Sequence, residues 1–112
     1  LDRLNSKQTE NPKVHRLGGL EVNEETVEVT VDDKSVKVTP IEFKILLLLI
    51  QNPGRVFPAE EIYERVWNER AVNTDTVMVH IRNLREKIEV NPREPKYVKV
   101  VWGVGYKIEK QP

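Results

Sequence analysis

Apolar residues at helical spacing mark residues 74–90, TDTVMVHIRNLREKIEV, as the helix around which the chain is organised. Four of them recur at intervals of four, three and four positions: Val77, Ile81, Leu84 and Ile88. At about 100° per residue these four share one narrow arc, which we expect to face the core. Val79 lies nearly opposite that arc, among basic residues, where a helix facing only water normally carries a charge.

The pattern between residues 15 and 38 is instead an alternation of apolar and polar residues, which predicts short, half-buried strands. The apolar positions are Leu20 and Val22, then Val27, Val29 and Val31, then Val36 and Val38. Turn-forming residues separate these groups at 18–19, 23–25 and 32–34. We therefore expect an antiparallel sheet at the start of the domain.

Two further helices are predicted between this sheet and residues 74–90. Thr39-Pro40-Ile41-Glu42 has the spacing of a capping box with proline at the first helical position, and the apolar run after it stops before Pro53. The second helix opens at Pro58 with acidic residues in its first turn. Residues 68–73 have no pattern and form a connection longer than the tight turn of a helix-turn-helix motif.

The chain closes with two alternating segments at 97–101 and 106–109, joined by Trp102-Gly103-Val104-Gly105, which predicts a β-hairpin. Strands, three helices and a closing hairpin make an α+β fold, a winged helix-turn-helix. In that fold the helix at 74–90 is expected to enter the major groove of DNA. The hairpin 97–109 is expected to act as a wing along the neighbouring backbone or minor groove.

A length of 112 residues suits one domain, which we place at 14–110, and the polar segment 1–13 is expected to be a linker. The chain has no cysteine, and neither His15 nor His80 has the spacing of a metal site, so no cofactor or metal is expected. No apolar run is long enough for a membrane span and no signal peptide is evident, which favours a cytoplasmic protein without membrane contact.

Net charge is zero, which by itself argues against a nucleic-acid partner. The charges are unevenly distributed, however: residues 1–73 carry ten Lys/Arg and thirteen Asp/Glu, whereas residues 74–112 carry eight and five. This asymmetry favours DNA only weakly, because many globular proteins show one of similar size.

Five motifs in order resemble the carboxy-terminal DNA-binding domain of the OmpR/PhoB family of two-component response regulators. They are VTPIEF at 38–43, NPGRVF at 52–57, EIYERVW at 61–67, TVMVHIRNLREKIE at 76–89 and VVWGVGYKIE at 100–109. The last of them is also similar to the regulators of vancomycin-resistance systems in Gram-positive bacteria.

The resemblance implies a receiver domain upstream of the linker, phosphorylated by a sensor histidine kinase. It also implies control of transcription through a head-to-tail dimer on tandem direct repeats of double-stranded DNA. The loop after the second helix corresponds to a segment that touches RNA polymerase in family members, and its residues here are Asn68, Glu69, Arg70 and Ala71.

The resemblance also assigns DNA-contact roles residue by residue. The positions expected at the DNA backbone are Thr76, His80, Arg82 and Arg85, and those expected to face base edges are Val79 and Asn83. Lys87, Lys99 and Trp102 complete the predicted contact set. Arginines would neutralise phosphates, and an asparagine can pair bidentately with adenine.

Three residues depart from the family pattern. Asp75 stands where an arginine is frequent, so that a phosphate contact is lost there, and Asn83 also replaces a frequent arginine. Trp102 stands where some members present a wing arginine to the minor groove, and it either packs under the hairpin or lies on a sugar face. The charge of the wing is then expected from Lys99 or Lys107.

Two other classes of function compete with DNA binding. A winged helix used for protein interaction would explain the zero net charge and the acidic Asp75 and Glu86 on the outer helix face. An enzyme needs a nucleophile with its base, a carboxylate pair or a phosphate loop, and no such spacing is present, so we expect no catalytic residues.

Overall fold

The amino-terminal sheet is a four-stranded antiparallel meander. In the computed structural model, which describes residues 13–109, β2 (Val14–Leu17), β3 (Leu20–Asn23), β4 (Glu28–Val31) and β5 (Lys34–Val36) pair in chain order. The turn between β4 and β5 consists of Asp32 and Asp33, both at positive φ, which suits the right-handed twist of a two-residue hairpin. The predicted sheet is confirmed, whereas the predicted linker lies, except for Lys13, outside the described residues.

Val27 is the residue of the sheet that the alternation misplaced. It lies in the turn before β4, at φ 57° and 60% exposed, instead of on the strand. The side chain of Asn23 builds this turn, because its Oδ1 accepts the N–H groups of Glu25 and Thr26. Strand pairing therefore resumes only at Glu28, opposite Asn23, and the prediction for Val27 was wrong.

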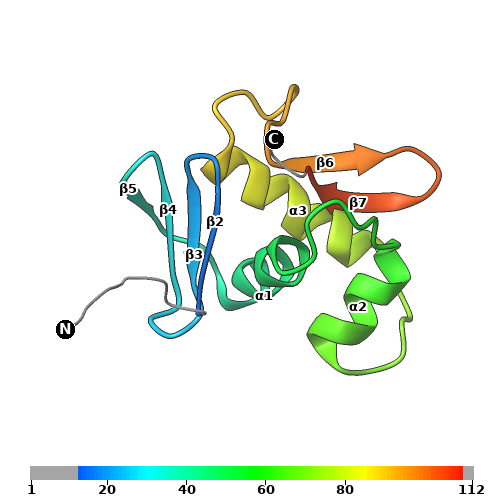
Figure 1. The fold of residues 1–112 in the computed structure, drawn as a ribbon. Coiled ribbons are helices and arrows are strands. Elements are labelled where there is room, and N and C mark those ends of the chain that lie inside the picture. The colour runs from blue at the N-terminus through cyan, green and yellow to red at the C-terminus, as the bar shows by residue number, and fades with distance from the viewer. Residues whose placement is uncertain (1–12, 110–112) are drawn as a thin grey trace.

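Three helices follow: α1 (Pro40–Ile50), α2 (Ala59–Trp67) and α3 (Asp75–Ile88). The capping box is confirmed, since the Thr39 hydroxyl accepts the Glu42 N–H at 3.2 Å and the Glu42 carboxylate accepts the Thr39 N–H at 3.0 Å. Figure 1 shows the sheet at one end of the molecule, α2 and the hairpin at the other, and α1 and α3 between them.

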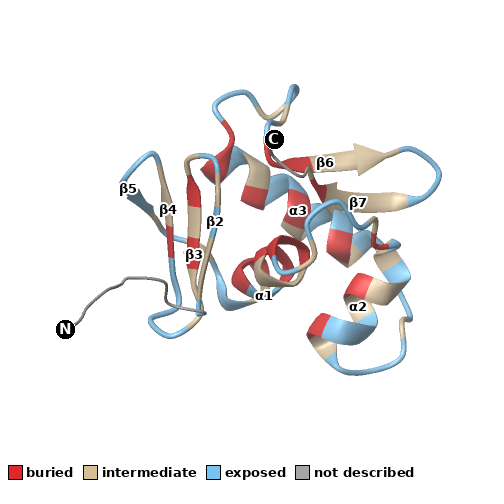
Figure 2. Ribbon diagram, viewed as in Figure 1, coloured by how far each residue is buried: buried red, intermediate tan, exposed pale blue. Residues whose placement is uncertain are grey.

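The core joins all of these elements into one cluster (Figure 2). Its buried apolar residues are Leu20, Val22, Val29, Phe43, Ile45, Leu46, Leu49, Ile50, Phe57, Ile62, Val66, Val77, Ile81, Leu84, Ile88, Tyr97, Val98 and Ile108. The four residues predicted as the buried stripe of α3 are among them, each at most 2% exposed. The apolar stripe of α3 therefore faces the core, as its spacing predicted.

The hairpin of β6 (Val98–Val101) and β7 (Gly105–Ile108) is fixed to the rest of the fold through the first residues of β7. Phe57 and Tyr106 exchange both backbone hydrogen bonds, at 2.8 and 2.9 Å. A Cβ at Gly105 would lie 2.1 Å from the Phe57 carbonyl oxygen, so only glycine permits this approach. The wing is thus held against the connection between α1 and α2 by β7.

Replacing Val27 by asparagine tests the strain at this turn. A β-branched residue is disfavoured at positive φ, whereas asparagine tolerates that conformation, so we expect Val27→Asn to raise the free energy of unfolding by about 1 kcal/mol. Urea denaturation measures the change.

The matched control is Val72→Asn, since Val72 is 87% exposed and is not at positive φ. We expect this control to leave the free energy of unfolding within about 0.5 kcal/mol of the parent. Equal effects of the two substitutions would show that the Val27 variant is stabilised by removal of an exposed apolar side chain and not by relief of backbone strain.

Candidate nucleic-acid interface

The outward face of α3 carries polar and apolar side chains side by side. Met78 and Val79 are 51% and 53% exposed, and Arg82, Asn83 and Glu86 are exposed beside them. Such a face offers a hydrogen-bonding amide, an aliphatic group and a guanidinium, which are the groups that read base edges and phosphates. Of the predicted contacts on α3, Val79, Arg82 and Asn83 are therefore fully available to a partner.

Two predicted backbone contacts lie deeper than expected. Thr76 and His80 are only partly exposed, and the His80 ring lies 5.7 Å from the Trp67 ring, which in turn stacks on Tyr63 at 4.7 Å. The Nδ1 atom of His80 is buried and has no hydrogen-bond partner among the described residues. His80 thus belongs in part to the packing between α2 and α3, and its DNA contact stays a prediction.

Arg85 lies in the seam between α3 and the wing. Its Nε donates to the Val98 carbonyl oxygen at 3.0 Å, and one terminal nitrogen, Nη2, is buried without a partner in the described part of the chain. Burial lowers the pKa of the guanidinium, although Tyr106 and Glu89 oppose the shift. An arginine keeps its proton at neutral pH, so this seam holds a partly desolvated positive charge.

Lys87 points toward the core side of the helix. Its Nζ lies 2.5 Å from Oε1 of Glu42, whose side chain is 2% exposed, while the Lys87 side chain is 34% exposed. Glu42 is also the carboxylate of the capping box. Because this buried carboxylate needs a cation, Lys87 has a structural role that its sequence position did not reveal.

The tip of the wing is apolar. Trp102 is 90% exposed and does not pack under the hairpin, so the first of its two predicted placements is wrong, and the second, on a sugar face, stays a prediction. Lys99 is half-buried and faces Lys107 across the strands, and Lys107 pairs with Glu109 at 3.2 Å. The charge expected from the wing lysines is therefore partly neutralised within the hairpin.

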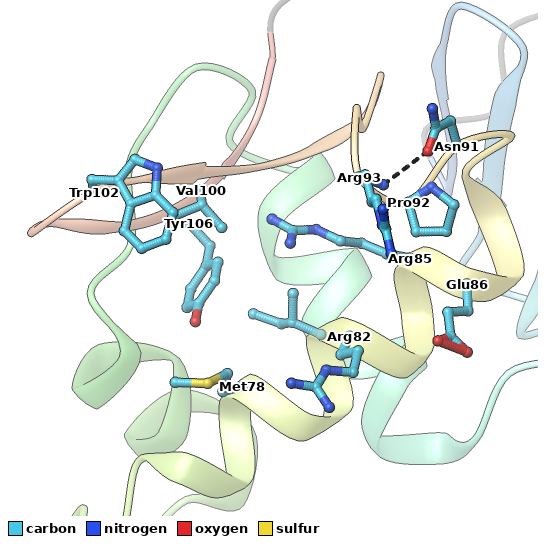
Figure 3. A pocket seen from close by; sticks show the side chains of 11 residues that line it. Met78, Arg82, Arg85, Glu86, Asn91, Pro92, Arg93, Val100, Trp102 and Tyr106 are labelled. Carbon is cyan, nitrogen blue, oxygen red and sulfur yellow. Dashed lines mark hydrogen bonds between the residues drawn. The ribbon is translucent and has the colours of Figure 1, made fainter.

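A groove of about 760 Å³ separates α3 from the wing. We call it the wing groove; its lining residues include Arg82, Arg85, Arg93, Trp102 and Tyr106. Figure 3 shows Arg85 reaching from α3 toward the wing, with Arg93 beside it. The groove therefore offers arginines on one side and two aromatic residues on the other.

Arg93 is the residue of this site that the sequence pattern missed. It is exposed on the connection between α3 and β6, where the Asn91 Oδ1 accepts its N–H at 3.1 Å. The connection has no periodicity, so nothing in the pattern distinguished this arginine from a solvated one. A basic residue between two turn-forming segments, Asn91-Pro92 and Glu94-Pro95, was the available signal.

The loop after α2 covers residues 68–74, one residue more than the predicted 68–73, because α3 begins at Asp75. Asn68 ends the helix in the left-handed conformation at φ 58°, and Asn68, Glu69 and Arg70 are exposed while Ala71 is half-buried. The Tyr63 hydroxyl donates to the Glu69 carboxylate at 3.5 Å. The loop is thus an accessible projection beside α3, and its contact with RNA polymerase stays a prediction.

Within residues 13–109, no helix has the length and apolar content that crossing a membrane requires. The same residues bring together no group of three or more His, Cys, Asp or Glu side chains that suits a metal ion.

The sheet, the three helices and the hairpin define a winged helix-turn-helix domain, and comparisons with known proteins agree. The family model described as "Transcriptional regulatory protein, C terminal" matches residues 33–108. The regulatory protein VanR of Enterococcus faecium is 43% identical over 106 residues, which cover 93% of this chain and 45% of VanR. The chain therefore spans less than half the length of this relative.

Solved structures give the same assignment. The response regulator DrrB of Thermotoga maritima, an OmpR/PhoB homologue, superposes with a TM-score of 0.80 at 32% identity over 87% of this chain and 44% of DrrB. The DNA-binding domain of the response regulator AdeR, in complex with an intercistronic region, superposes with a TM-score of 0.70 at 27% identity over 83% of this chain and 96% of that domain.

The chain belongs to the OmpR/PhoB family of carboxy-terminal, DNA-binding domains of transcriptional regulatory proteins. It is a DNA-binding effector domain for the control of transcription and not an enzyme. This assignment favours DNA binding over the two other classes of function that the sequence left open, a protein-interaction domain and an enzyme.

Replacing Lys87 by alanine separates its structural role from the predicted DNA contact. Breaking a fully buried ion pair costs about 3–5 kcal/mol, and because the lysine is 34% exposed we expect a smaller loss, about 1–2 kcal/mol of unfolding free energy. The dependence of duplex affinity on salt should stay that of the parent. Thermal unfolding and salt titrations of binding measure the two quantities.

Lys44→Ala is the matched control, because it removes an exposed lysine from α1. It should change neither quantity. Should Lys87→Ala keep its stability and show a shallower salt dependence, Lys87 is a phosphate contact and the structural role is wrong.

Proposed function

We propose that α3 lies in the major groove of double-stranded DNA, with Val79 and Asn83 facing base edges and Arg82 facing a phosphate. The observation that carries this proposal is the exposed outer face of α3 beside the arginine-lined wing groove. Asn83 is exposed and its amide can pair bidentately with an adenine, and Val79 offers an apolar contact to a thymine methyl group. The AdeR domain in complex with DNA supports the proposal at the level of the fold.

The proposal for the whole protein rests on its relatives. VanR is more than twice the length of the matched segment, which supports a receiver domain before residue 14 and a sensor histidine kinase acting on it. We infer a head-to-tail dimer on tandem direct repeats and a contact of residues 68–71 with RNA polymerase. A regulator that acts on bacterial chromosomal DNA works in the cytoplasm.

The charge distribution supports DNA over a protein partner for α3. Arg82 and Arg93 form no ion pair within residues 13–109, although five other lysines and arginines in this range pair with carboxylates at 3.2 Å or less. Arginines that have no ion pair within the protein can neutralise DNA phosphates, and this releases counterions from the DNA. The zero net charge thus hides a local excess of positive charge at the wing groove.

Selection of the purified chain against a randomised duplex pool tests the proposal. Sequencing of the bound fraction should show two copies of one motif in the same orientation, about one helical turn apart. Enrichment of a single copy would support DNA reading by α3 and contradict the tandem arrangement. Absence of any duplex binding would overturn the proposal in favour of a protein-interaction domain.

Removing Arg82 tests its predicted phosphate contact. We expect Arg82→Ala to weaken binding on all duplex sequences, with a salt slope shallower by about one. Arg16→Ala, which removes an exposed arginine from β2, is the matched control and should bind as the parent does. A variant that loses preference for one base but keeps its salt slope would place Arg82 at a base edge instead.

A further inference from the structure

The tip of the wing consists of Trp102, Gly103 and Val104, and it carries no charge. Trp102 is 90% exposed and Val104 is 55% exposed, while Gly103 turns the chain at φ 76° with open space around it. An indole side chain in water leaves a large apolar area unburied, and tryptophan is enriched where such area becomes buried against a partner. The tip therefore has the chemistry of a contact surface.

The hairpin holds this tip away from the core. Val101 and Gly105 are the last paired residues, so that residues 102–104 lie beyond the final strand pair. The close approach of Gly105 to the Phe57 carbonyl holds the tip-side end of β7 against the connection between α1 and α2. Figure 1 shows the tip projecting beyond the helices. Trp102 is thus exposed because the pairing of β6 with β7 ends just before it.

The surroundings of Trp102 indicate what it contacts. It lines the wing groove together with Arg82, Arg85 and Arg93, against a single acidic residue, Glu86 (Figure 3). A second hollow of about 500 Å³ continues past Arg93 to Lys99. The partner therefore combines negative charge with flat apolar faces at neighbouring points. A DNA strand has this combination, because each phosphate is followed by a sugar and a base.

We propose that Trp102, supported by Val104, enters the minor groove as an apolar wedge that unstacks a base step and bends the duplex. This inference rests on the proposed function, since α3 in the major groove places the wing over the adjoining minor groove. The strand between the two grooves then lies in the wing groove, where Arg82 and Arg93 face its phosphates. Apolar side chains inserted between base steps kink DNA in this way.

The wedge also predicts where the wing binds best. Pyrimidine–purine steps unstack and kink more easily than others, so the preferred sites carry a TA or CA/TG step beneath the wing. This preference arises from deformability, and it needs no hydrogen bond between the protein and a base.

Three substitutions of Trp102 test the wedge, and each keeps the fold because the side chain is exposed; far-UV circular dichroism checks this. Loss of one base–aromatic contact is expected to weaken duplex binding of Trp102→Ala about 10- to 100-fold, with the salt slope unchanged because no charge is removed. Trp102→Phe keeps an aromatic wedge and most of the affinity. Trp102→Arg steepens the salt slope by about one and lowers the bend.

Two further readouts report the wedge directly. The chain has two tryptophans, so the DNA-induced change in emission of the parent minus that of Trp102→Phe belongs to Trp102. We expect quenching of that signal on binding the duplex pool. Gel phasing on a selected site should show a smaller bend for Trp102→Ala than for the parent.

The outcomes separate this inference from the function on which it rests. If the parent binds duplex but Trp102→Ala binds as tightly, or if the Trp102 emission does not change, the wedge is wrong and the function stands. If the parent binds no duplex, both fail. A change in oligomeric state of Trp102→Ala without DNA, measured by analytical ultracentrifugation, would assign the tip to a second copy of the chain and overturn the wedge.

Discussion

One carboxylate sets the angle between α3 and the wing. Glu89 leaves the helix at its carboxyl end and is 7% exposed, and its two oxygens accept the backbone N–H groups of Lys96, Tyr97 and Val98 at 2.7 to 3.2 Å. A buried carboxylate is stable only when such donors satisfy it. Because one end of this network is α3 and the other is β6, it fixes the arrangement of the two parts that we propose to meet DNA. Arg85 strengthens the same joint through Val98.

The electrostatics of the domain follow from which charges are paired inside it. Lys87 is committed to Glu42 and Lys107 to Glu109, so these cations contribute little field outside the molecule. Arg82 and Arg93 have no such partner within residues 13–109, and both line the wing groove. A chain of zero net charge therefore presents local positive charge at one place, and this explains why the net value was a poor guide to the partner.

The pattern of residues predicted the fold correctly where the structure depends on local properties of the sequence. The stripe of α3 and the capping box at Thr39 were read correctly, since helical period and cap geometry are local properties of the sequence. Val27 was misread because the side chain of Asn23 ends the strand early, and alternation alone carries no such information. The ion pair of Lys87 and the place of Arg93 at the wing groove were not predicted, because they depend on Glu42 and on the wing, which the fold brings close only in space.

The contacts that fix the wing and the apolar tip of the wing have separate roles in the proposed recognition of DNA. A wing held by Glu89 and Gly105 cannot adjust its depth, so a side chain at its tip acts at a fixed distance from α3. An arginine at that point would adapt through its flexible stem and would add a salt-dependent contact. Trp102 has only two side-chain torsions and no charge, so in the proposed complex the DNA deforms to accommodate it. In the complex that we propose, base edges are therefore read in the major groove, and deformability is read at the wing.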